Sequence, residues 1–160
     1  MRYNTQVDPR WSSSIMTQGN IEGKSWVDKI GRWGCLVTSL ANIFQEHSQK
    51  EFTPFQFNEI LTGHKGYYFL SGKSKDINTA SFLDWDVAKS LLLFDVENNA
   101  QYSNDGYFIA RIQTAYGGHY INVIKKLSDY YLCFDVLDGY LKYLRYSEIT
   151  MLIKIKFIGG

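Results

Sequence analysis

The chain has 160 residues, with 45% hydrophobic side chains, 17 basic against 16 acidic residues, two cysteines and two prolines. A chain of this length folds as one ordinary domain and buries roughly 70% of the surface that its unfolded form exposes, so its core needs neither disulfides nor metal. The net charge of +1 excludes the crowded basic face that binds nucleic acid or anionic membranes. The high apolar content excludes a disordered chain.

The two ends of the chain bear on its expected location and domain organisation. Residues 1–11 lack the basic segment followed by an apolar run that marks a secretory signal. No apolar run approaches the roughly 20 residues that span a bilayer, so we expect cytoplasmic synthesis and no membrane span. Residues 1–160 form a single predicted domain, and Gly159-Gly160 fits either a frayed tail or the start of a linker to another domain.

Two helices are predicted in the first half. Residues 35–44 carry apolar side chains at helical spacing. The opposite face of this helix is polar and carries Thr38, Ser39 and Asn42. A second helix begins at Thr53-Pro54, a capping residue followed by a proline suited to the first turn, and it stops at Gly63.

The middle of the chain is less regular. Residues 63–76 are rich in Gly, Lys and Ser, which predicts a long loop. Between residues 78 and 99 two interpretations stay open, namely a helix over residues 83–92 and a buried strand over residues 91–96.

After residue 99 the sequence predicts an antiparallel meander, because β-branched and aromatic residues alternate with polar ones and turn residues recur at short intervals. The expected strands cover residues 107–114, 119–125, 130–136, 140–146 and 152–158. Lys154 and Lys156 in the last strand are typical of an edge strand. Helices followed by an antiparallel sheet indicate an α+β fold, with N-terminal helices packed on a C-terminal meander.

Cys35 follows Gly34 and opens the first predicted helix. Free N–H groups and the macrodipole at a helix N-terminus favour negative charge, so a thiol at this position ionises readily and becomes a nucleophile. The alternative is a buried cysteine that packs as a small hydrophobic residue, which is also our interpretation of Cys133.

His119 begins a predicted strand and has a carboxylate near it in either plausible strand register. If Ser128-Asp129 forms a two-residue hairpin loop, His119 lies opposite Asp138. If the loop is longer, His119 lies opposite Val136 and diagonal to Asp135. An imidazole whose tautomer is fixed by a carboxylate is a general base for a thiol. A half-exposed histidine bonded to a turn aspartate is the structural alternative.

Four segments of the sequence resemble papain-like cysteine peptidases. The closest group is akin to the bacteriocin-leader-processing, or double-glycine, peptidases, whose stand-alone relatives occur in bacteria and in phage lysins. These segments are residues 6–11, 34–42, 118–123 and 134–139. Their order, and the element that carries each, are specific together. The chain departs from the common pattern at Leu36-Val37 and Asp135-Val136, where the family commonly has Gly-Pro and Asp-Pro.

The resemblance implies a papain-like fold and a Cys-His-Asp triad. Cys35 would attack an amide carbonyl, and His119 would take the thiol proton and later protonate the leaving amine. Asp135 would orient His119, with Asp138 as the competing third member. Gln6 would join the backbone N–H of Cys35 in binding the oxyanion.

The implied function is hydrolysis of amide bonds by a cysteine peptidase. The resemblance to phage and bacterial members favours the peptides of peptidoglycan as substrate. The enzyme would then be an endopeptidase or amidase of a lysin, linked to a cell-wall-binding or tail domain and released by phage lysis or carried on a virion. Two alternatives stay open: a protease directed at a protein or leader sequence, and a non-catalytic binding module that keeps the fold.

Aromatic residues make up 16% of the chain, and most of those after residue 100 belong to the predicted sheet. Three stand beside proposed site residues and are candidates for lining a substrate cleft: Trp11, Trp33 and Tyr120. The sequence contains no metal-binding cysteine or histidine pattern and no Gly-rich phosphate loop after a strand. We therefore expect no cofactor, and a peptide or peptidoglycan as the partner.

Overall fold

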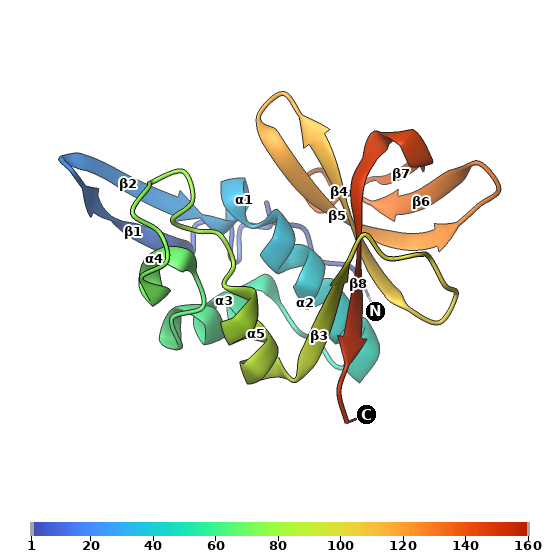
Figure 1. The fold of residues 1–160 in the computed structure, drawn as a ribbon, viewed down its shortest axis with the longest axis horizontal. Coiled ribbons are helices and arrows are strands. Elements are labelled where there is room, and N and C mark those ends of the chain that lie inside the picture. Colours follow the sequence, from blue (N-terminus) through green and yellow to red (C-terminus); the bar gives the residue numbers. More distant parts are fainter. Residues whose placement is uncertain (1, 160) are drawn as a thin grey trace.

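The computed structural model of the protein describes residues 2–159, so Gly160, part of the expected tail or linker start, lies outside the described range. Figure 1 shows an N-terminal hairpin, a group of helices and a twisted sheet. The elements in chain order are β1 (Ile15–Ile21), β2 (Lys24–Lys29), α1 (Ile30–Trp33), α2 (Cys35–Ser48), α3 (Pro54–Gly63), α4 (Tyr68–Ser71), α5 (Trp85–Leu92), β3 (Phe94–Asn98), β4 (Tyr107–Thr114), β5 (Gly117–Lys126), β6 (Tyr130–Phe134), β7 (Leu141–Arg145), a 3-10 turn (Tyr146–Glu148) and β8 (Ile149–Phe157).

The sheet has six antiparallel strands in the order β3-β8-β4-β5-β6-β7. The prediction of β8 as an edge strand is therefore wrong, because β8 pairs with β3 on one side and β4 on the other. Its lysines are explained by the pairing with β3, where Lys154 lies across from Glu97 and Lys156 across from Asp95. Opposite charges across a strand pair stabilise the sheet, so these lysines fit an internal strand.

Helix α2 is more deeply buried than its sequence pattern predicts. Its apolar side joins the main core, with Leu40 and Ala41 fully buried. The face expected to be polar is buried as well, and Thr38, Ser39 and Asn42 are at most 1% exposed. The helix contacts β5 as well as α3, so this side needs polar groups that bond to the sheet rather than to water.

The remaining elements correct or complete the sequence predictions. Thr53 caps α3 through a capping box with Gln56, as the Thr-Pro signal predicts. Residues 83–96 contain both a helix and a strand, since α5 ends at a left-handed Leu93 and β3 follows, but β3 is a largely exposed strand with Phe94 as its buried residue. The segment expected as a loop holds the short helix α4, and the hairpin β1–β2 was not predicted. Within residues 2–159 no helix is long and apolar enough to cross a bilayer.

Candidate active site

Cys35 is the first residue of the 14-residue helix α2. The Gly34 N–H donates to the Ile30 carbonyl oxygen at 2.8 Å, and a Cβ at Gly34 would lie 2.6 Å from that same oxygen. Only glycine fits this close approach. No side chain caps the helix at Gly34, so the N–H groups of the first turn, which have no partner within a helix, point toward the region of the partly exposed Cys35 thiol.

His119 lies on β5 between the nucleophile candidate and a carboxylate. Its Nε2 is 2.8 Å from Oδ1 of Asp135, which leaves Nδ1 as the ring nitrogen for Cys35. Burial lowers the pKa of His119, but hydrogen bonds to Asp135 and Cys35 outweigh burial and raise this pKa to about 9. The structure thus brings together Cys35, His119 and Asp135, three of the predicted site residues.

The pairing of β5 with β6 explains why the expected registers did not identify the carboxylate. Near the turn, Lys126 pairs with Tyr131, as a two-residue loop requires, but the register shifts between Val123 and Lys125. Beyond this β-bulge, Asn122 pairs with Phe134, so neither predicted register holds at His119. A bulge inserts one extra residue and redirects the strand, and Asp135, one residue past the end of β6, meets the imidazole.

Asp135 is 5% exposed and accepts hydrogen bonds at both oxygens. Oδ1 also accepts from the Leu137 N–H at 2.9 Å, and Oδ2 lies 2.8 Å from the Lys142 Nζ. Burial alone would raise the pKa of Asp135, but the bonds from His119, Lys142 and the Leu137 N–H hold it well below its usual range. The carboxylate is therefore ionised near neutral pH.

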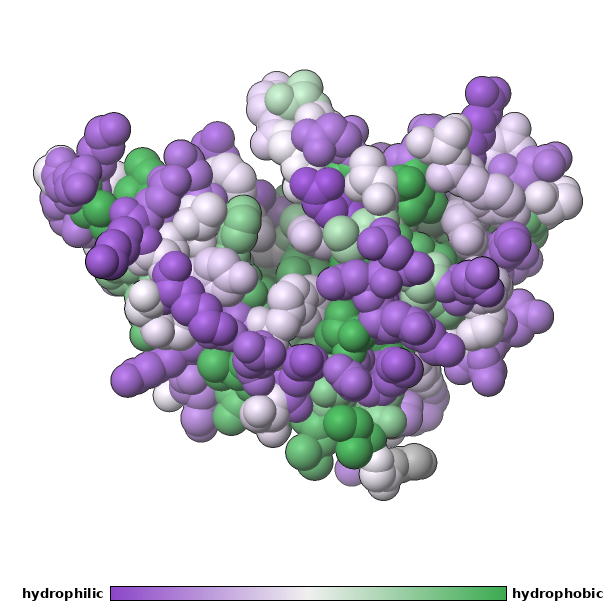
Figure 2. Space-filling view, viewed as in Figure 1, coloured by the Kyte–Doolittle hydropathy of each residue, from purple (hydrophilic) through white to green (hydrophobic). Residues whose placement is uncertain are grey.

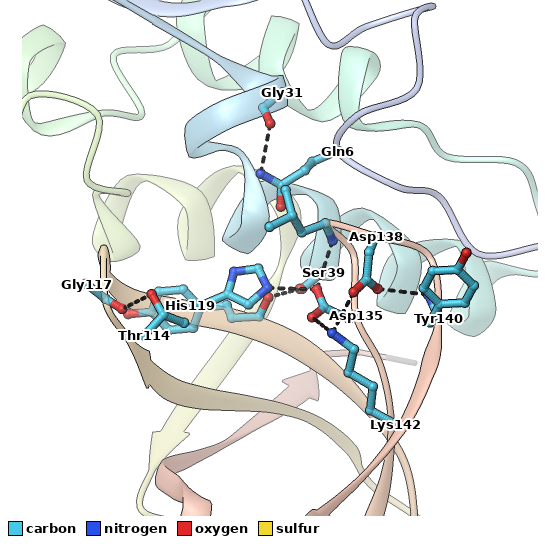
Figure 3. Close-up of polar contacts among 12 residues, drawn as sticks. Gln6, Gly31, Ser39, Thr114, Gly117, His119, Asp135, Asp138, Tyr140 and Lys142 are labelled. Atoms are coloured by element: carbon cyan, nitrogen blue, oxygen red, sulfur yellow. Dashed lines mark hydrogen bonds and ion pairs between the residues drawn. The ribbon is translucent and has the colours of Figure 1, made fainter.

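Asp138, the competing candidate for the third member of the triad, is connected to His119 only through Lys142 and Asp135. Its carboxylate is 2.6 Å from the Lys142 Nζ and accepts from the Tyr140 N–H at 3.0 Å. Figure 3 shows the resulting sequence of contacts, from His119 through Asp135 and Lys142 to Asp138. Asp135 is thus the carboxylate bonded to His119, and Asp138 contacts it only through Lys142.

A buried amide network holds α2 against β5 and so fixes Cys35 relative to His119. The Asn122 Nδ2 donates to the Ser39 carbonyl oxygen at 2.9 Å, and its Oδ1 accepts from the Asn42 Nδ2 at 2.9 Å. Asn42 also exchanges hydrogen bonds with the backbone of Asn4. Neither Asn4 nor Asn122 was predicted as a site residue, although Asn122 lies three residues after His119 in the segment that carries the resemblance.

Gln6 is 1% exposed and lies beside the short helix that precedes Cys35. Its backbone N–H donates to the Val136 carbonyl oxygen at 2.8 Å, and its Nε2 contacts the carbonyl oxygens of Ile30 and Gly31 at 3.5 and 3.3 Å. Its Oε1 is buried with no hydrogen-bond partner among the described residues. The N-terminal segment is thus fixed between α1 and the Asp135 loop (Figure 3).

The three aromatic candidates for the cleft differ in their placement. Trp11 is 3% exposed, belongs to the main core and donates its indole N–H to Thr5, so it does not line an open cleft. Trp33, in contrast, is 48% exposed, and Tyr120 is partly buried. Figure 2 shows the molecule hollowed between the β1–β2 hairpin and the β4–β5 turn. In the same view α1, which carries Trp33, lies between these two elements.

Other features are not part of the contact between Cys35, His119 and Asp135. Cys133 is fully buried and unpaired, and burial raises the pKa of its thiol to about 12, so it is a packed thiol as predicted. Residues 2–159 contain no cluster of three or more His, Cys, Asp or Glu side chains that could hold a metal ion. A cavity of about 700 Å³ lies between the N-terminal segment and the β6–β7 region, lined among others by Arg2, Phe134 and Leu141, and it includes neither Cys35 nor His119.

No protein family and no curated relative matches the sequence. Among solved structures, the chain is similar to the peptidase domain of Streptococcus ComA, described as a bifunctional ABC transporter involved in a quorum-sensing pathway. The TM-score is 0.52 at 15% identity, and the likeness covers 76% of this chain and 90% of that domain. A likeness at this identity defines the fold alone. The chain therefore has the papain-like α+β fold predicted from the sequence.

Proposed function

We propose that the protein is a cysteine peptidase that hydrolyses amide bonds with Cys35, His119 and Asp135. The observation that carries the proposal is the position of His119, which bonds to a buried carboxylate through Nε2 and lies near enough to Cys35 for the thiol to raise the pKa of the imidazole. A cysteine at a helix N-terminus next to an oriented imidazole is the arrangement that activates a thiol. The papain-like fold adds support, because that fold carries this chemistry in other proteins.

The proposed reaction follows from the roles of these groups. His119 holds the proton from the Cys35 thiol, and the thiolate attacks the substrate carbonyl carbon to form a C–S bond. The carbonyl oxygen becomes an oxyanion, which the backbone N–H of Cys35 and the Gln6 amide stabilise. When the oxyanion collapses, the C–N bond breaks and His119 gives its proton to the leaving amine. Water then attacks the thioester with His119 as base, which releases the acid and restores the thiol.

For Gln6 this role requires one amide hydrogen to point toward the site. Its contacts to Ile30 and Gly31 are long, so the amide is weakly held in the described conformation. Substrate binding offers the Nε2 a stronger acceptor, because hydrogen bonds to a charged oxygen are shorter and roughly twice as strong as neutral ones.

The proposed substrate is a peptide, and peptidoglycan stem peptides are the preferred class by resemblance to lysin domains. The alternative is a leader-directed protease, which the resemblance of the sequence to double-glycine peptidases favours. The two differ in what is cut. A lysin releases soluble fragments and new amino termini from purified cell walls, whereas a leader-directed enzyme leaves walls intact and cuts a peptide chain.

The experiment compares the native chain with Cys35→Ser and Cys133→Ser on purified cell walls, unfolded casein and synthetic peptides. Cys35→Ser removes the nucleophile and should abolish hydrolysis, while Cys133→Ser changes a buried thiol that has no role in the proposed reaction and should retain it. Alkylation by iodoacetamide should block activity in proportion to modification of Cys35, mapped by mass spectrometry. If biological activity survives complete Cys35 modification, the protein is a binding module and the proposal is wrong.

A further inference from the structure

Lys142 touches the carboxylate that orients His119, and nothing in the sequence resemblance assigns it a role. It lies on β7, an edge strand of the six-stranded sheet. Its Nζ is 2.8 Å from the Asp135 Oδ2 and 2.6 Å from the Asp138 Oδ2. Lys142 therefore connects the outermost strand to the centre of the candidate site.

The geometry at Asp135 gives Lys142 a defined task. Oδ1 is occupied by the His119 Nε2 and the Leu137 N–H, and Oδ2 by the Lys142 Nζ. A carboxylate held at both oxygens has little freedom to rotate about its side-chain bonds. The Asp135 side chain is only 7% exposed, so water is a poor replacement for the lysine at Oδ2, and losing that donor leaves a buried charged oxygen short of partners.

We propose that Lys142 is a positioning residue of the catalytic site, which fixes the rotation of Asp135 and offsets part of its negative charge. The inference rests on the proposed function. An ordinary surface ion pair contributes little to stability. The Lys142–Asp135 pair differs, because Asp135 is buried and bonded to His119, the general base.

The positive charge on Lys142 should lower the pKa of His119. Asp135 stabilises the imidazolium, and a lysine on the far oxygen of the same carboxylate weakens that stabilisation. Without the lysine, Asp135 acts on His119 with its full charge, so the pKa of His119 rises. Without the Asp138 charge, the lysine interacts with Asp135 alone, so the pKa of His119 falls. The two substitutions shift the same histidine in opposite directions.

Other titratable groups lie around the network of His119, Asp135, Lys142 and Asp138. Cys35 faces His119 from α2. On the other side, Cys133 faces Asp135, and burial raises the pKa of its thiol to about 12. Arg111 on β4 lies over Gly118 and beside Tyr120, whose pKa is raised by burial despite that arginine. Between pH 5 and 9.5 the Cys133 thiol stays protonated, so replacing Cys35 with serine leaves His119 as the group whose titration the NMR signal follows.

The test is an NMR titration of the His119 imidazole in the full chain carrying Cys35→Ser. Lys142→Met should raise the pKa of His119 by about half a unit or more, and Asp138→Asn should lower it. Lys142→Arg, which keeps the charge, should leave it near the starting value. The matched control is Lys125→Met, the same change at an exposed lysine of β5, which should not move it. His47→Asn and His64→Asn assign the remaining imidazole signals.

In the chain with Cys35 intact, Lys142→Met should lower the hydrolysis rate about 10-fold, the size seen when a partner that orients a metal-binding histidine is lost, and Lys142→Arg should restore most of it. An unmoved His119 in both Lys142→Met and Asp138→Asn, or shifts of the same sign, would overturn the inference. Should Lys142→Met fail to fold, Asp138→Asn still decides the sign. The titration needs no substrate, so a chain that hydrolyses nothing refutes the proposed function but leaves this result readable.

Discussion

His119 and Asp135 are joined by a 2.8 Å contact between Nε2 and Oδ1, although β6 has ended at Phe134, one residue before the carboxylate. The contact assigns the two ring nitrogens different tasks. With Nε2–H donated to Asp135, Nδ1 is the nitrogen left to exchange a proton with Cys35 in the proposed reaction. Altering Asp135 should therefore act in two ways. The Nε2–H of His119 loses the partner that fixes the tautomer, and the imidazolium loses the negative charge that stabilises it.

Asp135→Ala should lower the hydrolysis rate by about 10²-fold or more, because the general base loses both its orientation and its stabilising charge. Asp135→Asn should lose less, since the amide oxygen still accepts from Nε2–H. Both variants should shift the alkaline limb of the pH-rate profile, expected near pH 9 in the native chain from the His119 pKa of about 9, toward lower pH. Equal rates and unshifted limbs would exclude Asp135 from the triad and return Asp138 as the candidate.

Gln6→Ala should reduce kcat by about 10²- to 10³-fold with little change in KM, as removal of one oxyanion donor usually does. The side chain is buried, so a loss of stability has to be separated from a loss of rate. Asn58→Ala is the matched control, because Asn58 is also a buried amide but bonds to Ile15 and Tyr67, away from the site. This control should lower the thermal unfolding midpoint and retain kcat. A Gln6→Ala enzyme with native kcat would remove Gln6 from the oxyanion site.

Those parts of the candidate site that depend on local signals are predictable from the sequence. Gly34-Cys35 at the start of a periodic apolar segment and His119 at the start of a strand are readable because each rests on a few neighbouring residues. The choice between Asp135 and Asp138 was not readable, since it depends on the bulge between Val123 and Lys125. No turn or capping signal marks that irregularity in the sequence.

Lys142 and Asn122 were missed for a related reason. A lysine on an alternating strand is usually a solvated residue, and an asparagine in a strand carries no pattern of its own. Their roles appear only when β7 reaches the Asp135 loop and α2 packs on β5. The position of β8 between β3 and β4 is equally non-local, so sequential strands predicted a meander where the chain instead returns to the middle of the sheet.

Gly34→Ala should displace the nucleophile, because the added Cβ would meet the Ile30 carbonyl oxygen at 2.6 Å and the backbone there has to move. We expect slower alkylation of Cys35 by iodoacetamide and a parallel loss of hydrolysis of about 10-fold or more, in line with the cost of small misplacements at a reacting centre. Gly63→Ala is the matched control, since a Cβ at Gly63 meets nothing within 4 Å and alanine is the better helix former. An alkylation rate at Gly34→Ala equal to that of the control would contradict this account.

Asn122→Ala should lower the free energy of unfolding by about 1–3 kcal/mol, because it removes one hydrogen bond from the buried Asn42 amide and one from the Ser39 carbonyl oxygen. Asn42→Ala should cost a similar amount. The double variant should cost less than the sum of the two, since each single change already breaks their mutual bond. Urea unfolding of the four chains measures the coupling, and additive losses would show that the two amides act independently.

His119 and Asp135 should make the free energy of unfolding depend on pH in opposite directions, His119 on the alkaline side of neutrality and Asp135 on the acid side. The pKa of His119 rises from 6.5 to about 9 on folding, so its contribution is complete below about pH 6.5 and is lost as the pH rises toward 9. The pKa of Asp135 is lowered on folding, so its contribution is complete above its ordinary range near 3.8 and is lost as the pH falls below that range. The free energy of unfolding should therefore decline from pH 6.5 to 9.

Urea unfolding at intervals from pH 5 to 9 measures this decline. His119→Ala should flatten it, and His64→Ala, the loss of an imidazole at the exposed end of α3, should not. The range stops at pH 9 because ionisation of tyrosines contributes above it, where burial raises the pKa of Tyr67 and so favours its neutral form in the folded chain. A decline that persists in His119→Ala would assign the alkaline loss of stability to another group and would mean that the imidazolium at this site is not stabilised by folding.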